Sequence, residues 1–329
     1  MVLGEFLDEW NDRSETLLVH TSGSTGKPKP IQVEKKRMEE SARITCNFLG
    51  LHAGDTALLC LPLDYIAGKM MVVRALTCGL QLIEVSPASH PLACLVGKGQ
   101  RIDFAAMVPM QVYNSLQVPE ERRLLLTIRH LIIGGGAIDD AMEQQLRTFP
   151  NAVWSTYGMT ETLSHVALRR LNGEEASLWY TPFESVRVGL NEDNCLVIDA
   201  PRVCNAVLTT NDIAEMAEDG RRFRIIGRKD NVIDSGGIKI QAEEVERLLR
   251  PYMLKPYLIT KRHDGELGEA VVLLVQFSDV EQVREVCRRV LPKYWQPRCI
   301  LSVSAIPMTQ TGKPDRARAE HMASRGKEQ

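Results

Sequence analysis

Residues 21–29 read Thr-Ser-Gly-Ser-Thr-Gly-Lys-Pro-Lys, and they connect an apolar run, Thr16–His20, to a stretch with helical spacing at residues 34–49. The glycines of this segment, Gly23 and Gly26, allow backbone N–H groups to converge on an anion. Further donors for phosphate oxygens are the hydroxyl and ammonium groups of Thr21, Ser22, Ser24, Thr25, Lys27 and Lys29. A Walker loop differs, because it separates its glycines more widely and has Ser or Thr after the lysine. The density of donors favours a phosphate-binding loop over a plain connection rich in Gly and Ser.

Around this loop, short apolar runs alternate with longer amphipathic stretches over the first two thirds of the chain. The pattern predicts strands at Thr16–His20, 56–61, 81–85, 104–108, His130–Ile133 and 152–155. It predicts helices at 34–49, Ile66–Cys78, 110–115 and 139–149. Strands that alternate with helices are typical of an α/β domain with a largely parallel sheet. Residues 186–226 instead predict the short strands and turns of a β-rich subdomain.

A charged segment at residues 227–231 predicts a boundary between two domains. We expect a large N-terminal domain at residues 1–229 and a small, mobile α+β domain at residues 230–329. The second domain is predicted to contain strands at 232–240 (interrupted by Gly236-Gly237), 270–277 and 300–306, and helices at 242–250 and Val280–Val290. The tail after Arg316 is polar and is expected to fray.

Composition narrows the class of protein. The chain has 329 residues, 44% of them hydrophobic and 25% charged, which excludes disorder over the whole length. Its formal net charge is -2, and this balance argues against a protein that wraps nucleic acid. The 8 cysteines match no zinc spacing, so we expect reduced thiols in a cytoplasmic protein. Residues 1–10 lack a basic signal-peptide start, and the apolar runs are too short to insert in a membrane.

Further motifs follow the first one along the chain. They are Tyr157-Gly158-Met159-Thr160-Glu161-Thr162, Thr209-Thr210-Asn211-Asp212, Gly227-Arg228-Lys229-Asp230 with the segment at 235–240, and Thr311-Gly312-Lys313-Pro314-Asp315-Arg316. In this order they resemble the adenylate-forming, or AMP-binding, family, which includes acyl-CoA synthetases, adenylation domains and luciferases. The resemblance covers nearly the whole chain. It departs from the family pattern at Asn211, where the family has Gly, and at Tyr65, where it has His, and it implies a shortened N-terminal part.

The resemblance implies an enzyme that uses ATP, Mg²⁺ and CoA to join an acid to the CoA thiol through an acyl-adenylate. It implies that the residues binding ATP or AMP are Thr21, Ser22, Gly23, Ser24, Thr25, Gly26, Lys27, Gly135, Gly136, Tyr157, Gly158, Asp212 and Arg228. Lys313 and Thr160 are implied to be catalytic, because positive charge and donors must meet the α-phosphate. Glu161 is the implied Mg²⁺ ligand. A surface lysine and a helix-end charge are the plainer interpretations of Lys313 and Glu161.

The same resemblance implies conformational roles for the C-terminal domain. Asp230 is the implied hinge, and Gly236 and Gly237 are implied to line a channel for CoA. A β-bulge is the plainer interpretation of the two glycines. We expect small-molecule partners only (the acid, ATP and CoA), with no nucleic acid, and a homo-oligomer stays open.

The identity of the acid is less well defined by the residues. Within the family the chain most resembles the bacterial 2-succinylbenzoate–CoA ligases of menaquinone synthesis. Their substrate has a second carboxylate that must be neutralised, and the candidate acid-pocket residues are Tyr65, Lys69, Arg74, Ser164 and His165. One alternative is an amino-acid adenylation domain that serves a carrier protein, with Asp64 pairing the substrate ammonium group. Another is a non-catalytic protein that binds ATP or AMP.

Overall fold

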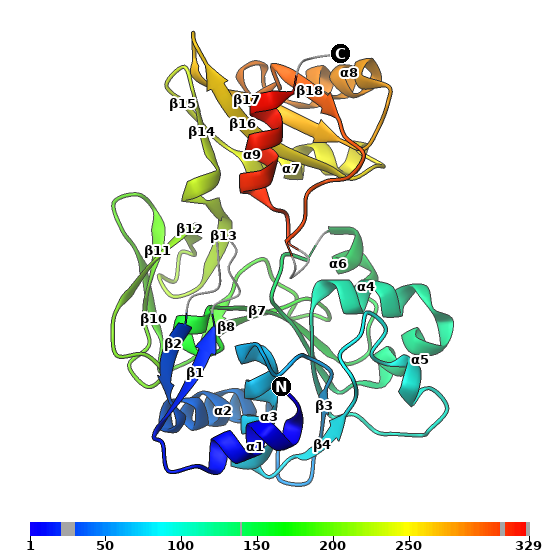
Figure 1. Cartoon of the computed structure of the whole chain (residues 1–329), viewed down its shortest axis with the longest axis vertical. Coiled ribbons are helices and arrows are strands. Elements are labelled where there is room, and N and C mark those ends of the chain that lie inside the picture. The colour runs from blue at the N-terminus through cyan, green and yellow to red at the C-terminus, as the bar shows by residue number, and fades with distance from the viewer. Residues whose placement is uncertain (21–29, 139, 310–312, 327–329) are drawn as a thin grey trace.

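The computed structural model describes residues 1–20, 30–138, 140–309 and 313–326 (Figure 1). The predicted phosphate loop at residues 21–29, with its candidate ligands Thr21 to Lys27, lies outside the described residues, as do residues 311 and 312 of the last motif. The lower part of the molecule is built on a twisted sheet with helices on both faces, and the C-terminal part lies above it.

The main sheet has the strand order β4-β3-β5-β6-β7-β8-β9. Its strands are β3 (Thr56–Leu59), β4 (Gln81–Glu84), β5 (Phe104–Met107), β6 (His130–Ile133), β7 (Ala152–Gly158), β8 (His165–Arg170) and β9 (Thr181–Pro182). The pairs from β4 to β7 are parallel, and β8 and β9 join antiparallel. The predicted α/β class with a largely parallel sheet is therefore confirmed.

Two apolar cores cover the two faces of this sheet because successive strand residues point to opposite sides. In β5, for example, Phe104 and Ala106 belong to one core, while Ala105 and Met107 belong to the other. The helices α2 (Lys35–Leu49) and α3 (Ile66–Cys78) pack on the first face, and α4 (Pro109–Gln117), α5 (Pro119–Thr127) and α6 (Asp140–Leu146) pack on the second. The short η1 (Ala93–Leu95) lies beside the second core.

The chain begins with α1 (Leu3–Asn11), followed by an antiparallel pair, β1 (Thr16–His20) and β2 (Pro30–Glu34). A second antiparallel sheet contains β10 (Arg187–Leu190), β11 (Cys195–Asp199), β12 (Leu208–Met216) and β13 (Phe223–Arg228). This sheet confirms the predicted β-rich subdomain. β2 and α5 were not predicted: the first is a short strand that begins with proline, and the second follows α4 without a polar loop between them.

The C-terminal part begins with η3 (Lys229–Asn231) and has its own sheet and cores. Its other elements are β14 (Val232–Ser235), β15 (Ile238–Gln241), α7 (Ala242–Leu249), η4 (Arg250–Tyr252), β16 (Tyr257–Asp264), β17 (Gly268–Val275), α8 (Val280–Val290), η5 (Lys293–Trp295), β18 (Cys299–Ser302) and α9 (Arg316–Arg325). The strand order is β15-β14-β17-β16, and β18 runs parallel to β17. The predicted division after residue 229 stays a prediction, although the change of sheet falls at the same place.

Two predictions about this part need correction. The predicted strand at 232–240 is a hairpin, because Gly236 (φ 61°) and Gly237 (φ 83°) form a turn that needs positive φ at both positions. The tail after Arg316 does not fray, since α9 continues to Arg325. Asp315 caps this helix by accepting a hydrogen bond from Arg318 N (3.0 Å), and the small side chains of its buried face allow close packing on β16.

Arg316, the first residue of α9, ties the start of that helix to the rest of the C-terminal part. Its guanidinium donates to Ile259 O (2.8 Å) and to Glu246 Oε2 (3.0 Å) on α7. Glu246 also accepts from Ile259 N (2.9 Å), so the three residues form one closed network. Burial raises the pKa of the Glu246 carboxyl, and the Arg316 charge opposes that rise.

All 8 cysteines lie in the described part of the chain, and none of them forms a disulfide there. The reduced state of the thiols stays a prediction. Among the described residues, no helix is both long enough and apolar enough to span a membrane.

Two histidines, the buried His165 and the half-buried His130, make stability depend on pH. Burial, helped by the charges of Arg129 and Arg170, lowers the pKa of His130 to about 4, and burial lowers the pKa of His165 well below its ordinary value. The unfolded chain takes up these protons near pH 6.5, whereas the folded chain does not. We therefore expect the urea midpoint to fall as the pH is lowered from about 6.5 to about 4. His130→Gln should make this fall smaller; an equal fall in both proteins would contradict the assignment.

Candidate active site

The candidate site lies where β7 ends, next to the second sheet and beneath the C-terminal part. Tyr157, at the end of β7, donates its hydroxyl hydrogen to Asp212 Oδ2 (2.6 Å) on β12. Arg228, opposite Asp212 on β13, donates to Asp212 Oδ1 (3.3 Å). Burial raises the pKa of the Tyr157 phenol and the Asp212 charge raises it further, so the phenol stays a hydrogen-bond donor. The structure thus brings three predicted nucleotide-binding residues into one group.

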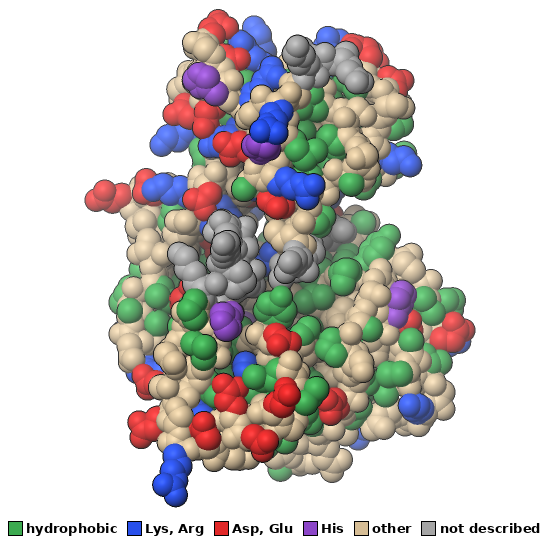
Figure 2. Space-filling model, viewed as in Figure 1, with side chains coloured by type: hydrophobic (Ala, Val, Ile, Leu, Met, Phe, Trp, Pro, Cys, Tyr) green, Lys and Arg blue, Asp and Glu red, His purple; other side chains and the backbone are tan. Residues whose placement is uncertain are grey.

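Lys313 belongs to the same group, although it comes from the C-terminal part. Its backbone is held by Thr309: Thr309 N donates to Lys313 O (2.7 Å), and Lys313 N donates to Thr309 Oγ1 (3.1 Å). Burial lowers the pKa of the Lys313 amine, the nearby Arg228 charge lowers it further, and Asp212 opposes both. The amine therefore lies within electrostatic range of Arg228 and Asp212. Figure 2 shows the C-terminal part lying above the rest of the molecule.

Thr160 and Glu161 form a single turn, η2 (Thr160–Thr162), directly after β7. The Thr162 hydroxyl fixes this turn by accepting from Met159 N (3.0 Å) and approaching Ser164 O (2.8 Å). Thr160 is buried and Glu161 is half-buried. The described residues contain no group of three His, Cys, Asp or Glu side chains that could hold a metal. A single carboxylate still fits Mg²⁺, which takes most of its ligands from water and phosphate.

Gly158 of the second motif, and Gly134 directly before the predicted Gly135-Gly136, stand where neighbouring atoms leave no room for a side chain. A Cβ at Gly134 would lie 2.2 Å from Thr156 Oγ1, and a Cβ at Gly158 would lie 2.3 Å from Ser164 O. Gly135 and Gly136 are exposed just after β6, at the same edge of the sheet. This edge is where ligands bind in open α/β sheets. The adenine-binding role of these glycines stays a prediction.

A second group surrounds Arg74, a buried residue of α3. Its Nη2 donates to Ser164 Oγ (2.7 Å), and the Ser164 hydroxyl contacts His165 Nδ1 (3.2 Å). His165 Nε2 in turn contacts Thr45 Oγ1 (3.1 Å) on α2. The structure therefore brings together three of the predicted acid-pocket residues. Thr45 was missed, because nothing in the sequence connects a threonine of a predicted helix to a residue 120 positions away.

The Arg74 charge is unusual because no described carboxylate forms an ion pair with it. Its side chain is 2% exposed, and its Nε has no hydrogen-bond partner in the described part of the chain. The guanidinium also lies over the Phe104 ring, 5.9 Å from the centroid. Burial lowers the pKa of Arg74 to about 10. A buried charge of this kind is costly unless a partner neutralises it.

Lys69 and Tyr65 do not join the group around Arg74. Lys69 points to α1 instead, where it pairs with Glu9 Oε2 (3.2 Å) and lies over the Phe6 ring. Tyr65 is the half-buried N-cap residue of α3. Asp64, the alternative partner for a substrate ammonium group, is exposed and binds the N-terminal amine of Met1 (3.2 Å).

The predicted hinge residue, Asp230, lies within hydrogen-bond distance of Arg228 in the first group. Its carboxylate accepts from Arg228 Nη2 (2.9 Å), so Arg228 bridges Asp230 and Asp212. The other predicted C-terminal residues, Gly236 and Gly237, form the β14–β15 turn. Their proposed roles are not decided by these contacts.

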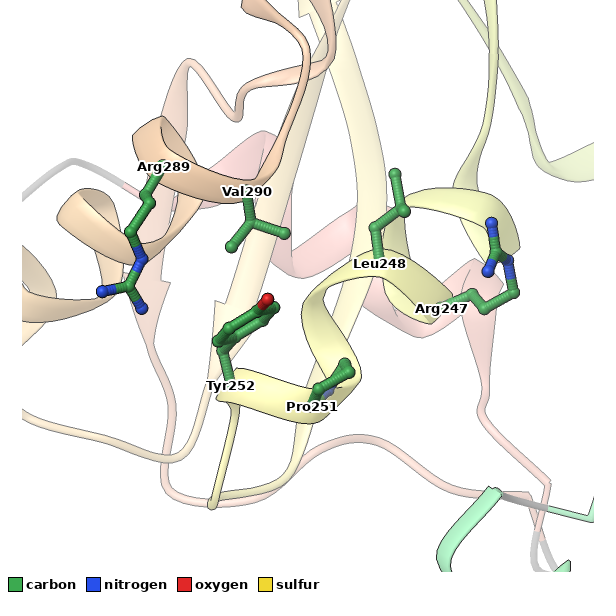
Figure 3. Close-up of a pocket in the computed structure, with 6 residues that line it drawn as sticks. All are labelled: Arg247, Leu248, Pro251, Tyr252, Arg289 and Val290. Atoms are coloured by element: carbon green, nitrogen blue, oxygen red, sulfur yellow. The ribbon is translucent and has the colours of Figure 1, made fainter.

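A separate hollow of about 420 Å³ opens on the surface of the C-terminal part (Figure 3). It lies between α7, η4 and α8 and is lined by Arg247, Leu248, Pro251, Tyr252, Arg289 and Val290. Arg289 packs over the Tyr252 ring (5.4 Å), which partly closes it. None of the predicted site residues lines this hollow.

Comparison with known proteins defines the class. A family model described as AMP-binding enzyme matches residues 7–191, more than half of the chain. A solved acyl-CoA synthetase (AMP-forming)/AMP-acid ligase II-like protein from Dyadobacter fermentans is 34% identical, with a TM-score of 0.64, over 97% of this chain and 92% of its own. The fold is that of AMP-forming acyl-CoA synthetases and ligases. The chain belongs to the AMP-binding family of adenylate-forming enzymes.

More distant relatives carry more specific names. The 2-succinylbenzoate–CoA ligase of Enterococcus faecalis is 27% identical over 94% of this chain and 70% of its own length. The ligase of Haemophilus influenzae with the same name is 28% identical over 79% of this chain and 59% of its own. The O-succinylbenzoate CoA synthetase of Bacillus subtilis, solved with ATP and magnesium, has a TM-score of 0.75 at 21% identity over 92% of this chain and 69% of its own, and it shares the fold.

Proposed function

We propose that this protein joins a carboxylic acid that has a second anionic group to CoA, with ATP as the energy source. The acid that fits best is 2-succinylbenzoate, which would give the protein a place in menaquinone synthesis. The observation that carries this proposal is the buried Arg74 guanidinium, which donates to Ser164 and has no carboxylate partner among the described residues. An anionic substrate group would supply that partner. The names of the relatives support the same acid.

In the first half-reaction, a carboxylate oxygen attacks the α-phosphorus of ATP and the bond to pyrophosphate breaks. Both reactants are anions, so Lys313 offsets the charge that gathers on the α-phosphate, with Thr160 as a hydrogen-bond donor. The Asp212 carboxylate has lone pairs left to accept from ribose hydroxyls. Mg²⁺ held by Glu161 would neutralise the departing phosphates. The phosphate loop at residues 21–27 completes this assignment.

In the second half-reaction, the CoA thiol loses its proton and attacks the acyl carbon, and the bond between acyl carbon and AMP oxygen breaks. We propose that residues 230–329 turn about Asp230 between the two steps. This motion withdraws Lys313 and brings the Gly236-Gly237 turn to the site as a wall of the CoA channel. The protein would thus consist of the two domains 1–229 and 230–329.

Gly237→Leu tests the channel. We expect this variant to lose most thioester formation from supplied acyl-adenylate and to keep ATP–pyrophosphate exchange, because a side chain at the open turn would enter the thiol path. Positive φ at Gly237 also strains any leucine, at a cost of about 1–2 kcal/mol. Gly220→Leu is the matched control, since Gly220 has φ 65° and open space but lies in a distant turn. Normal thioester formation by Gly237→Leu would rule out the proposed channel at this turn.

The whole proposal is tested by pyrophosphate release from ATP with 2-succinylbenzoate, a panel of amino acids and simple monocarboxylic acids. We expect release with 2-succinylbenzoate, followed by transfer to CoA. Release with amino acids alone would favour an adenylation domain that serves a carrier protein. No release with any acid would favour a protein that only binds the nucleotide.

A further inference from the structure

The linker that follows β13 is held to the second sheet by two consecutive side chains. Lys229 Nζ pairs with Asp193 Oδ2 (2.7 Å), which lies between β10 and β11. The next residue, Asp230, accepts hydrogen bonds from Asn211 Nδ2 on β12, at 3.3 Å and 3.5 Å to its two carboxylate oxygens. Both contacts lie on the side of the linker that faces the N-terminal part, and neither touches a residue of the C-terminal sheet.

The other side of the linker is held by the C-terminal part itself. Gln241 Nε2 donates to Arg228 O (2.9 Å), and Asn231 Nδ2 donates to Glu243 at the start of α7. Gly227 packs so closely under this group that a Cβ there would lie 2.4 Å from Gln241 Nε2. A turn of the C-terminal part about Asp230 would carry the Asn231–Glu243 contact along with it. The Gln241–Arg228 contact and the Asn211–Asp230 contact span the pivot and would have to break. The Lys229–Asp193 pair lies just before the pivot, where it fixes the linker so that Asp230 is presented to Asn211.

We propose that Asn211 and Asp193 are positioning residues that hold the linker in the arrangement that this structure has, with Asp230 bonded to the second sheet. This inference rests on the proposed two-step function, because it assigns the two residues to the arrangement for adenylation. Neither residue lies among those that touch the nucleotide in the proposed function. They act through Lys229 and Asp230, by stabilising one of two orientations of the C-terminal part.

The expected effect is modest, because these contacts are exposed: the side chains of Lys229 and Asp193 are 51% and 54% exposed. An exposed contact shifts an equilibrium by about two- to five-fold. The Lys229–Asp193 pair should also weaken with salt, since ionic strength screens exposed charges. The Asn211–Asp230 contact joins a neutral amide to a carboxylate, so it should be less sensitive to salt.

The experiment uses the full chain with Asn211→Gly, Asp193→Asn and the double variant. Glu215→Gln is the control, because it removes an equally exposed pair with Arg224 (2.7 Å) on the same sheet, away from the linker. We measure the rate of thioester formation from supplied acyl-adenylate, divided by the rate of ATP–pyrophosphate exchange. This ratio should rise about two- to five-fold in each single variant, more in the double variant, and stay unchanged in the control. The Asp193→Asn effect should shrink at high salt.

Trypsin cleavage after Lys229 reports on the linker without requiring any reaction. Cleavage should be about two- to five-fold faster in the three linker variants and unchanged in Glu215→Gln. An unchanged ratio of half-reactions in both single variants would overturn the positioning role, even if cleavage became faster. If the wild-type protein releases no pyrophosphate with any acid, the proposed function fails, and unchanged cleavage would then overturn the linker contacts as well.

Discussion

Lys313→Ala is expected to lower ATP–pyrophosphate exchange by about 10²–10³-fold, while thioester formation from supplied acyl-adenylate stays within a few fold of wild type. The amine lies within electrostatic range of Asp212 and Arg228, where the α-phosphate is expected to gain charge during adenylation. No phosphorus is attacked in the second half-reaction, so the lysine has no charge to offset there. Exchange is measured with labelled pyrophosphate, and thioester formation is measured in a single turnover.

Two matched variants separate this role from a general disturbance of the structure around Lys313. Lys313→Arg keeps a positive charge but changes its shape, so it should recover part of the exchange rate. Lys255→Ala removes a lysine of the same C-terminal part that lies outside the site, and it should change neither rate. An equal loss in both half-reactions for Lys313→Ala would contradict the assignment.

Arg74→Met is expected to lower kcat/KM for 2-succinylbenzoate by about 10²-fold or more, because the second carboxylate would be buried without its partner. For 4-oxo-4-phenylbutanoate, which lacks that carboxylate, the change should be no more than a few fold. The two acids share the carboxylate that is activated, so the comparison isolates the charge that Arg74 would meet. Pyrophosphate release with each acid gives both values.

The stability of Arg74→Met provides a further check. In the absence of substrate, the variant replaces a buried charge that lacks a carboxylate partner among the described residues with an apolar side chain. Its free energy of unfolding should therefore equal or exceed that of the wild type. Arg74→Lys keeps the charge and should retain more activity than Arg74→Met. Equal losses of kcat/KM with both acids would show that Arg74 does not bind the second carboxylate.

The strongest sequence predictions concern elements whose apolar pattern has clear ends. Ile66–Cys78 and Val280–Val290 were predicted with the bounds that the structure has. The first of these helices ends at Gly79 in the left-handed conformation, a stop signal that the sequence displays. By contrast, α9 has only small buried side chains and a polar surface, so its packing on the sheet could not be inferred from hydrophobic spacing.

In the candidate site, too, some residues could be grouped from the sequence and others could not. Motif order predicted that Tyr157, Asp212, Arg228 and Lys313 share one site, and the structure brings these four together. In the acid pocket, Lys69 and Arg74 were equal candidates, although residues five apart on a helix point in clearly different directions. The sequence could not tell which of the two faces the pocket. The ion pair with Glu9 turns Lys69 toward α1, and this contact depends on where α1 packs. The acid-pocket role of Arg74 stays a prediction.

The Arg316 network has a mechanical consequence for the lysine three residues before it. Arg316 is bonded to both Ile259 and Glu246, so the chain three residues after Lys313 is fixed to the C-terminal part. The same helix, α7, also contacts the linker, because Glu243 accepts a hydrogen bond from Asn231 Nδ2. In the proposed rotation, the C-terminal part would therefore move as one rigid unit, because the segments next to Asp230 and next to Lys313 are both bonded to α7. A substitution that destabilises α7 would therefore be expected to displace the Lys313 ammonium group, although α7 itself would contact no reactant.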